Sequence, residues 1–262
     1  MAEVAVTGLC KSFVRGDGSV LPTLNSLDLQ AAHGEFVCLV GPSGSGKSTT
    51  LNILAGLTEP DAGEIRVNGQ SSRGRVRFGY VFQHPRLLNW KPVRDNLAFV
   101  LAAAGVPRQE WRDRADHYLN LVGLMPFSDE YPLRLSGGMQ QRVAIARALV
   151  IEPDVLLMDE PFSSLDELTA RQMRVGLLHI WQQDRRTIVF VTHNALEAAY
   201  LADRIYVLSK RPATVLDEVC VDLPRPRDID DAALTPVQKR LLATLLAQDE
   251  HADGPSSADP HL

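Results

Sequence analysis

The sequence is poor in cysteine and has no long hydrophobic run, and each of these absences excludes a class of protein. Its 262 residues include three cysteines, Cys10, Cys38 and Cys220, too few and too scattered for a disulfide framework or a metal cage. The longest apolar stretch, Leu97–Val106, is about half as long as a bilayer span. The first residues lack the basic and apolar segments of a signal peptide. We therefore expect a protein of a reducing compartment. If the protein acts at a membrane, we expect another chain to span it.

The chain also lacks a large excess of positive or negative charge. The chain has 27 Lys and Arg residues against 32 Asp and Glu residues, for a net charge of −5, and Asp249–Leu262 carries acids without Lys or Arg. The body is therefore nearly neutral, and we expect no nucleic-acid partner. Hydrophobic residues make up 45% of the chain, the usual proportion in a soluble globular protein.

Short β-rich runs alternate with helical patterns along the chain. This alternation predicts an α/β fold with a largely parallel core sheet. The predicted strands are Val4–Val6, Glu35–Val40, Glu64–Val67, Phe78–Phe82, Val155–Met158, Thr187–Thr192 and Ile205–Leu208. The predicted helices are Lys47–Leu57, Trp111–Val122, Gly137–Val150, Asp166–Trp181 and Asn194–Ala202.

Composition divides the chain into a main domain, residues 1–223, and a C-terminal extension, residues 224–262. Residues 84–150 have helical patterns and almost no strand pattern, which predicts a helical subdomain inserted in the α/β core. Pro224–Arg227 is typical of a linker, and Pro236–Ala247 predicts a short helix. That helix packs on the body or, as the alternative, binds a partner. The acidic tail from Asp249 is too polar to form a core, and we expect it to be disordered.

A glycine-rich segment between a predicted strand and a predicted helix matches the phosphate-binding pattern G-x-x-x-x-G-K-[ST]. Its backbone N–H groups and the helix N-terminus form an anion site. Lys47 supplies a positive charge to the β- and γ-phosphates of a nucleotide, and the Ser48 hydroxyl is placed to bind Mg²⁺. The segment is Gly41, Pro42, Ser43, Gly44, Ser45, Gly46, Lys47, Ser48 and Thr49.

Two acids follow the apolar run Val155–Met158. In P-loop enzymes the first acid after such a strand holds Mg²⁺, and this role falls to Asp159. Glu160 is placed to act as a general base on the water that attacks the γ-phosphate. Such a pair could by itself also cap a helix, but the phosphate-binding segment upstream favours the catalytic interpretation.

Many classes of enzyme share the phosphate-binding loop and the strand-end acids. One class is distinguished from the others by a further motif, Leu135-Ser136-Gly137-Gly138-Met139-Gln140-Gln141-Arg142. It resembles the signature motif of ATP-binding cassette (ABC) proteins. The resemblance implies a P-loop fold with a RecA-like parallel sheet, an antiparallel β subdomain and a helical subdomain. It also implies two copies of the chain, each sandwiching ATP between its own phosphate loop and the partner's Ser136, Gly137 and Gly138.

Other elements of the family occur in order. Gln83 resembles the Q-loop glutamine, which contacts Mg²⁺ and water, and His193 resembles the switch histidine that contacts the γ-phosphate. Asp166, in Ser163-Ser164-Leu165-Asp166, resembles part of the D-loop at the dimer interface. Phe13 holds the place of the aromatic residue that stacks on adenine; a core phenylalanine is the alternative.

Within the family, Leu87-Leu88-Asn89-Trp90 and the stretch Leu208–Pro212 most resemble the nitrate, sulfonate and taurine importers. This resemblance implies a peripheral subunit on the cytoplasmic face of the membrane. Transmembrane permease subunits are its direct partners, and a solute-binding protein is an indirect one. Leu87, Leu88 and Trp90 would contact the permease or, alternatively, fill the core of the helical insertion. An exporter subunit and a non-transport ABC ATPase remain alternatives.

Overall fold

The core of the molecule is a six-stranded sheet in the order β10-β9-β3-β8-β7-β6. The computed structural model describes residues 2–71 and 76–250. Strand β10 is antiparallel to β9, and the other neighbours pair in parallel. The bounds are β3 (Phe36–Val40), β6 (Phe78–Val81), β7 (Val155–Asp159), β8 (Thr187–Thr192), β9 (Arg204–Leu208) and β10 (Val215–Cys220).

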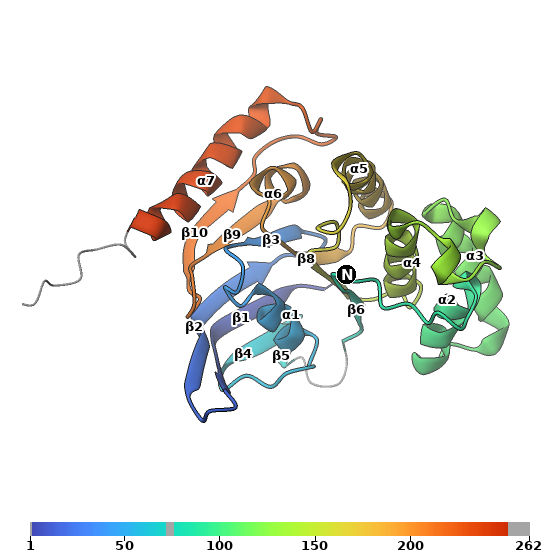
Figure 1. Ribbon diagram of the computed structural model, residues 1–262, viewed down its shortest axis with the longest axis horizontal. Coiled ribbons are helices and arrows are strands. Elements are labelled where there is room, and N and C mark those ends of the chain that lie inside the picture. Colours follow the sequence, from blue (N-terminus) through green and yellow to red (C-terminus); the bar gives the residue numbers. More distant parts are fainter. Residues whose placement is uncertain (1, 72–75, 251–262) are drawn as a thin grey trace, which may run out of the picture.

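A second sheet, four-stranded and antiparallel, lies beside the first in the order β2-β1-β4-β5 (Figure 1). Its strands are β1 (Val4–Val14), β2 (Val20–Ala31), β4 (Ala62–Val67) and β5 (Gln70–Ser71). Helix α1 (Lys47–Leu54) packs between the two sheets, because Leu51 and Leu54 belong to one buried cluster with Leu29 of β2 and Leu39 of β3.

Helices cover the other face of the core sheet. They are α5 (Glu167–Gln183), α6 (Ala195–Leu201) and α7 (Thr235–Glu250). Alternate residues of β3 explain both coverings: Val37 and Leu39 contact the α1 cluster, whereas Phe36 and Cys38 belong to the cluster that includes Trp181 of α5. A strand that is covered on both faces becomes almost wholly apolar, which is why this strand is evident in the sequence.

A helical arm projects from the β6–β7 side of the sheet (Figure 1). It contains α2 (Val93–Ala103), α3 (Trp111–Leu121) and α4 (Gly137–Leu149), with short 3₁₀ turns at Arg108–Glu110, Met125–Phe127 and Pro132–Arg134. All of these elements fall within the helical insertion predicted for residues 84–150. The buried side chains of α2 and those of α4 belong to the same hydrophobic cluster.

The antiparallel strands were the elements hardest to predict from the sequence. Strand β2 and strand β10 were not predicted, and the run Val4–Val6 is only the start of the 11-residue β1. The register of β1 against β2 shifts at Leu9 and again at Lys11. Such irregularities interrupt the alternation of apolar and polar residues that marks a strand in sequence.

The C-terminal extension is attached more firmly than its composition predicts. Arg227 is buried and donates to the carbonyl oxygens of Ala199 at 3.1 Å and Ala202 at 2.6 Å, at the end of α6. Arg225 donates to Asp203 at 2.7 Å and stacks on Trp181. The interpretation of Pro224–Arg227 as a linker is therefore wrong: its arginines satisfy carbonyl groups that a helix end leaves free.

Helix α7 begins one residue before the predicted helix and ends at Glu250, beyond the predicted Ala247. Leu241 is buried in the main cluster, so the helix packs on the body. A short 3₁₀ turn, Ala232–Leu234, precedes it. The disordered tail was predicted to begin at Asp249, which is wrong for residues 249–250 because they belong to α7; from residue 251 onward the tail lies outside the described residues.

Candidate functional site

The glycine-rich segment forms the loop between β3 and α1. Gly44 and Gly46 have φ angles of 76° and 91°, a region that residues with a Cβ rarely adopt. A Cβ on Gly46 would also lie 2.7 Å from Leu24 Cδ2. The loop curls around the end of the Lys47 side chain, whose Nζ donates to the carbonyl oxygens of Gly41 and Pro42, each at 2.8 Å.

Lys47 is the buried cation of this loop. Burial lowers its pKa, while the carboxylates of Glu160 and Asp159 act in the opposite direction. The Nζ atom lies 3.7 Å from Glu160 Oε1. A cation held this close to an acid and to backbone carbonyls is fixed in position before any anion arrives, which is the preorganisation that phosphate binding needs.

Two predicted acids meet the loop because β7 lies next to β8 and one strand from β3. The carboxyl ends of parallel strands share one edge of the sheet, so Asp159 emerges beside Ser48 and His193 beside Glu160. Ser48 Oγ lies 2.9 Å from Asp159 Oδ1. His193 Nδ1 lies 2.9 Å from Glu160 Oε2.

Glu160 has a φ of +43°, unusual for a residue with a side chain. Its backbone N–H donates to Val191 O at 3.0 Å and its carbonyl accepts from Ser163 Oγ at 3.0 Å, which holds this conformation. Strained backbone at the end of a buried strand is typical of functional sites. It places the Glu160 carboxylate between Lys47 and His193.

The donor set around Ser48 fits a magnesium ion that is shared with a phosphate. Burial raises the pKa of Asp159, and the Ser48 hydrogen bond only partly offsets this effect, so a nearby cation would stabilise its ionised form. The described residues contain no cluster of three or more His, Cys, Asp or Glu able to hold a metal. Mg²⁺ typically binds one carboxylate together with substrate phosphates, which agrees with this sparse set.

Lys47, Ser48 and Glu160 line one open cavity of about 360 Å³, whereas Asp159 and His193 are not among its lining residues. Phe13 is at its mouth, 40% exposed, so the alternative that Phe13 is a core residue is wrong. An exposed aromatic ring can stack on a base. The lining residues are Phe13, Leu21, Thr23, Ser43, Gly44, Gly46, Lys47, Ser48, Thr49, Gln83, Glu160 and Arg211.

Sequence reasoning missed three lining residues, Leu21, Thr23 and Arg211. Leu21 and Thr23 lie on β2, the strand that was not predicted. Arg211 follows β9, and the only indication in the sequence is a basic pair, Lys210-Arg211, after a predicted strand. Nothing in the sequence order places β9 next to β3, so the proximity of Arg211 to the loop is a product of the sheet order.

The remaining predicted residues lie elsewhere or contact different groups. Gln83 lines the cavity, and its Nε2 donates to Ser163 Oγ at 3.2 Å. Ser136 caps α4 by accepting from Met139 N at 3.3 Å, and Asp166 caps α5 by accepting from Thr169 N at 3.0 Å. Neither cap lines the cavity.

The two signature glycines also lie at the start of α4, outside the cavity of their own chain. A Cβ on Gly138 would come within 2.6 Å of Thr169 Cγ2. The missing side chain therefore lets α4 approach the first turn of α5. This packing requirement is independent of any contact with phosphate.

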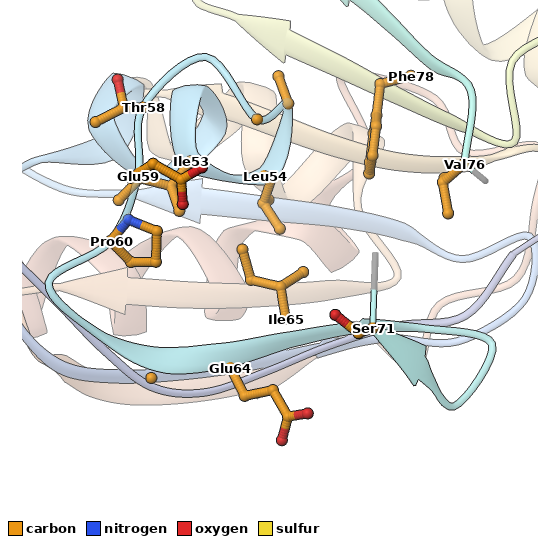
Figure 2. A pocket seen from close by; sticks show the side chains of 13 residues that line it. Ile53, Leu54, Thr58, Glu59, Pro60, Glu64, Ile65, Ser71, Val76 and Phe78 are labelled. Atoms are coloured by element: carbon orange, nitrogen blue, oxygen red, sulfur yellow. The ribbon is translucent and has the colours of Figure 1, made fainter. Parts of the chain in front are cut away.

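A separate cavity of about 380 Å³ lies between the end of α1 and strand β4 (Figure 2). Apolar side chains such as Ile53, Ile65 and Phe78 face it, together with Thr58 and Glu59. It shares no lining residue with the cleft around Lys47. None of the predicted site residues lines this second cavity.

A parallel sheet with a phosphate loop after β3, and acids at the end of β7, one strand away, defines a P-loop nucleotide hydrolase. A family profile described as ABC transporter matches residues 24–163. The chain belongs to the ABC transporter family, and it is an ATPase whose fold is the ABC cassette.

Individual relatives agree with this assignment. The chain is 48% identical over 223 residues to the nitrate import ATP-binding protein NrtD of Synechocystis sp., covering 85% of this chain and 84% of that protein. It is 41% identical over 247 residues to the aliphatic sulfonates import ATP-binding protein SsuB 2 of Burkholderia cenocepacia, covering 94% and 88%. The dimeric post-hydrolysis structure of the ATP-binding cassette MJ0796 bound to ADP and Pi is 32% identical, with a TM-score of 0.74, and the match covers 84% of this chain and 100% of that one.

Across the described residues, no helix is both long and apolar enough to cross a membrane.

Proposed function

We propose that this chain energises the import of a small solute of the nitrate, sulfonate or taurine type through a separate membrane permease. It would sit at the cytoplasmic face of the membrane as a peripheral subunit, and a solute-binding protein would deliver the solute to the permease. The observation that carries the proposal is the cluster of contacts at the cleft, in which Ser48 meets Asp159 and Glu160 lies close to both Lys47 and His193. The import functions named for the relatives with 48% and 41% identity support the direction of transport.

Within one chain, each group has a distinct part in hydrolysis. Lys47 and the loop N–H groups hold the phosphates, and Phe13 stacks on the adenine ring. Glu160 accepts a proton from the attacking water, and His193, 2.9 Å from Oε2, orients that carboxylate. Gln83, which lines the same cavity, would contact Mg²⁺ and the attacking water.

Ser48, Asp159 and Gln83 would hold Mg²⁺, which supplies charge neutralisation to the phosphate oxygens. The chain's own contribution is positioning. Phosphoryl transfer to water has a loose transition state, so the fixed placement of Lys47 and Glu160 provides much of the rate enhancement.

Closure of two copies would complete the site. Ser136 and Gly138 lie at the N-terminus of the 13-residue α4, a place where backbone N–H groups attract anions. They lie outside the cavity of their own chain, so they would contact the γ-phosphate held by a second copy, with Gly137 and Asp166 at the same interface. The similarity to a dimeric cassette supports this arrangement.

A groove beside Gln83 is suited to the permease. It has a volume of about 350 Å³ and lies between the core sheet and the helical arm, where Phe82, Leu88 and Phe99 line it. Trp90 is 73% exposed, so the alternative that it fills the core is wrong for this residue, whereas Leu87 does pack against the core cluster. Trp90→Ala should therefore reduce transport while leaving the ATPase rate of the isolated subunit unchanged, and equal retention of both activities would remove the coupling role.

Reconstitution tests the proposed function directly. The chain is coexpressed with a candidate permease and solute-binding protein, and solute uptake into vesicles is measured with nitrate, an alkanesulfonate or taurine outside. ATP-dependent uptake that disappears in Lys47→Ala is the expected result. Export of solute, or ATPase activity that no permease alters, would overturn it.

A further inference from the structure

The loop after β9 brings a second cation to the nucleotide cleft. Arg211 lines the same cavity as Lys47 and Phe13. A Cβ built on Gly44 would lie 3.4 Å from Arg211 Nη2, so the guanidinium lies against the phosphate-binding loop. Its position follows from the sheet order, because β9 pairs with β3, the strand that enters that loop.

The Arg211 guanidinium is available to a ligand, because the described charged groups of the cleft do not pair with it. Among the described lining residues the charged side chains are Lys47, Glu160 and Arg211. Glu160 lies close to Lys47 and His193, and no ion pair joins Arg211 to a carboxylate within the described part of the chain. Guanidinium groups bind phosphate oxygens through two parallel N–H donors.

The backbone on both sides of Arg211 is held in place. Ala213 N donates to Thr23 O at 2.8 Å, and Asn25 N donates to Ala213 O at 2.9 Å, so β2 fixes the residues after Arg211. Ser209 N donates to Thr214 O at 3.0 Å, which closes the turn. The side chain of Arg211 itself is exposed.

The C-terminal helix α7 holds the residues before Arg211. Lys210 N donates to Gln248 Oε1 at 2.7 Å, and Gln248 Nε2 donates to Leu208 O at 3.4 Å. One side chain near the end of α7 thus contacts the backbone at two points of the loop. The body of α7 is anchored by buried Leu241 and by the ion pair of Arg240 with Asp217.

We propose that Arg211 binds the phosphate chain of the nucleotide, and that Gln248 is a positioning residue that holds the Arg211 loop against the phosphate-binding loop. The proposal rests on the proposed nucleotide cleft, and it gives the C-terminal extension a part in nucleotide affinity.

Equilibrium binding to the full chain tests the role of Arg211. Arg211→Ala should raise the Kd for ATP and ADP about tenfold, the loss expected for one charge-assisted hydrogen bond, and Arg211→Lys should lose less. Adenosine lacks phosphates, so its Kd should stay unchanged. Arg112→Ala, which removes an equal charge from the helical arm at a side chain 80% exposed, is the matched control and should bind all three ligands as the wild type does.

Two results would overturn the assignment. ATP affinity that is unchanged in Arg211→Ala shows that the guanidinium does not bind the nucleotide. An equal loss of ATP and adenosine affinity shows that it acts on the base or ribose rather than on phosphate. Both differ from failure of the proposed nucleotide cleft, in which the wild-type chain would bind ATP no better than Lys47→Ala does.

A double-mutant cycle tests Gln248. Gln248→Ala should raise the Kd for ATP by a smaller factor, leave kcat nearly unchanged and add nothing in the Arg211→Ala background, because its effect passes through that side chain. Gln248→Glu keeps the acceptor for Lys210 N and should recover part of the affinity. An effect of Gln248→Ala that persists in full without Arg211 would refute the positioning role.

Discussion

Replacing Glu160 by Gln changes the charge at the centre of the cleft while preserving the size of the side chain. In the wild type, Oε2 lies 2.9 Å from His193 Nδ1 and Oε1 lies 3.7 Å from Lys47 Nζ. The amide can keep a hydrogen bond to His193, but it cannot accept a proton from water. General-base catalysis contributes about 10²- to 10⁴-fold, so kcat should fall by that factor, about 3 to 5 kcal/mol in activation free energy.

Nucleotide binding should respond differently from turnover. The substitution removes a negative charge beside Lys47, and burial already lowers the pKa of that lysine. The phosphates of ATP then meet less repulsion, so affinity for ATP should stay equal or increase. The variant should accumulate as an ATP-bound dimer, because closure no longer ends in hydrolysis.

Three measurements on the same preparation decide the matter: phosphate release, equilibrium ATP binding, and molar mass by light scattering with and without MgATP. Glu64→Gln is the matched control, since that acid is 52% exposed on β4 and pairs only with Arg66 among the ion pairs described. Hydrolysis at the wild-type rate in Glu160→Gln would refute the base assignment. Loss of ATP binding together with turnover would show that Glu160 supports the structure of the cleft instead.

Three further predictions concern other groups of the site. Phe13→Ala should raise the Kd for ATP about tenfold, because stacking on a base contributes about 1–3 kcal/mol, whereas Phe13→Tyr should keep the affinity; equal binding by Phe13→Ala would exclude stacking. Burial raises the pKa of Asp159, so its contribution to stability is greatest at low pH and is lost as pH rises through the folded pKa. Asp159→Asn should therefore raise the Tm of the nucleotide-free chain by more above the folded pKa of Asp159 than below it, and remove stabilisation by MgATP; a Tm difference that stays constant across a pH titration would contradict this reasoning. Gly138→Ala, whose Cβ would meet Thr169 Cγ2 at 2.6 Å, should lower the free energy of unfolding in urea by about 1–3 kcal/mol. Adding Thr169→Ala should restore that stability, and a double variant as unstable as Gly138→Ala would show that the clash is not the cause.

Much of the fold was predictable because its central strands are covered on both faces. Such strands are nearly continuous apolar runs, and the chemistry lies at their ends: the glycine-rich loop after β3, Asp159 as the last residue of β7 with Glu160 next, and a histidine after β8. The positions of these residues relative to their strands are local in sequence. Their clustering then follows from the rule that parallel strands end at one edge of the sheet.

The β subdomain and the C-terminal extension were less accessible. Strand β2 has an irregular register with β1, and it alternates regularly between buried and exposed residues only over residues 27–31. The arginines of Pro224–Arg227 resemble a solvated linker in sequence, yet they bind carbonyl groups of α6 and the carboxylate of Asp203. Those contacts join residues more than 20 positions apart, so no local pattern records them.

The chemical groups that the protein brings to a nucleotide can be recognised in the amino-acid sequence, because phosphate-binding loops and strand-end acids depend on neighbouring residues along the chain. Which distant residues share the cleft depends instead on the three-dimensional fold. Phe13 and Arg211 reach it from β1 and from the loop after β9, whereas Ser136 and Asp166 cap helices outside it. The reason is that strand order and helix packing are set by the burial of whole faces, which no short segment of the chain specifies.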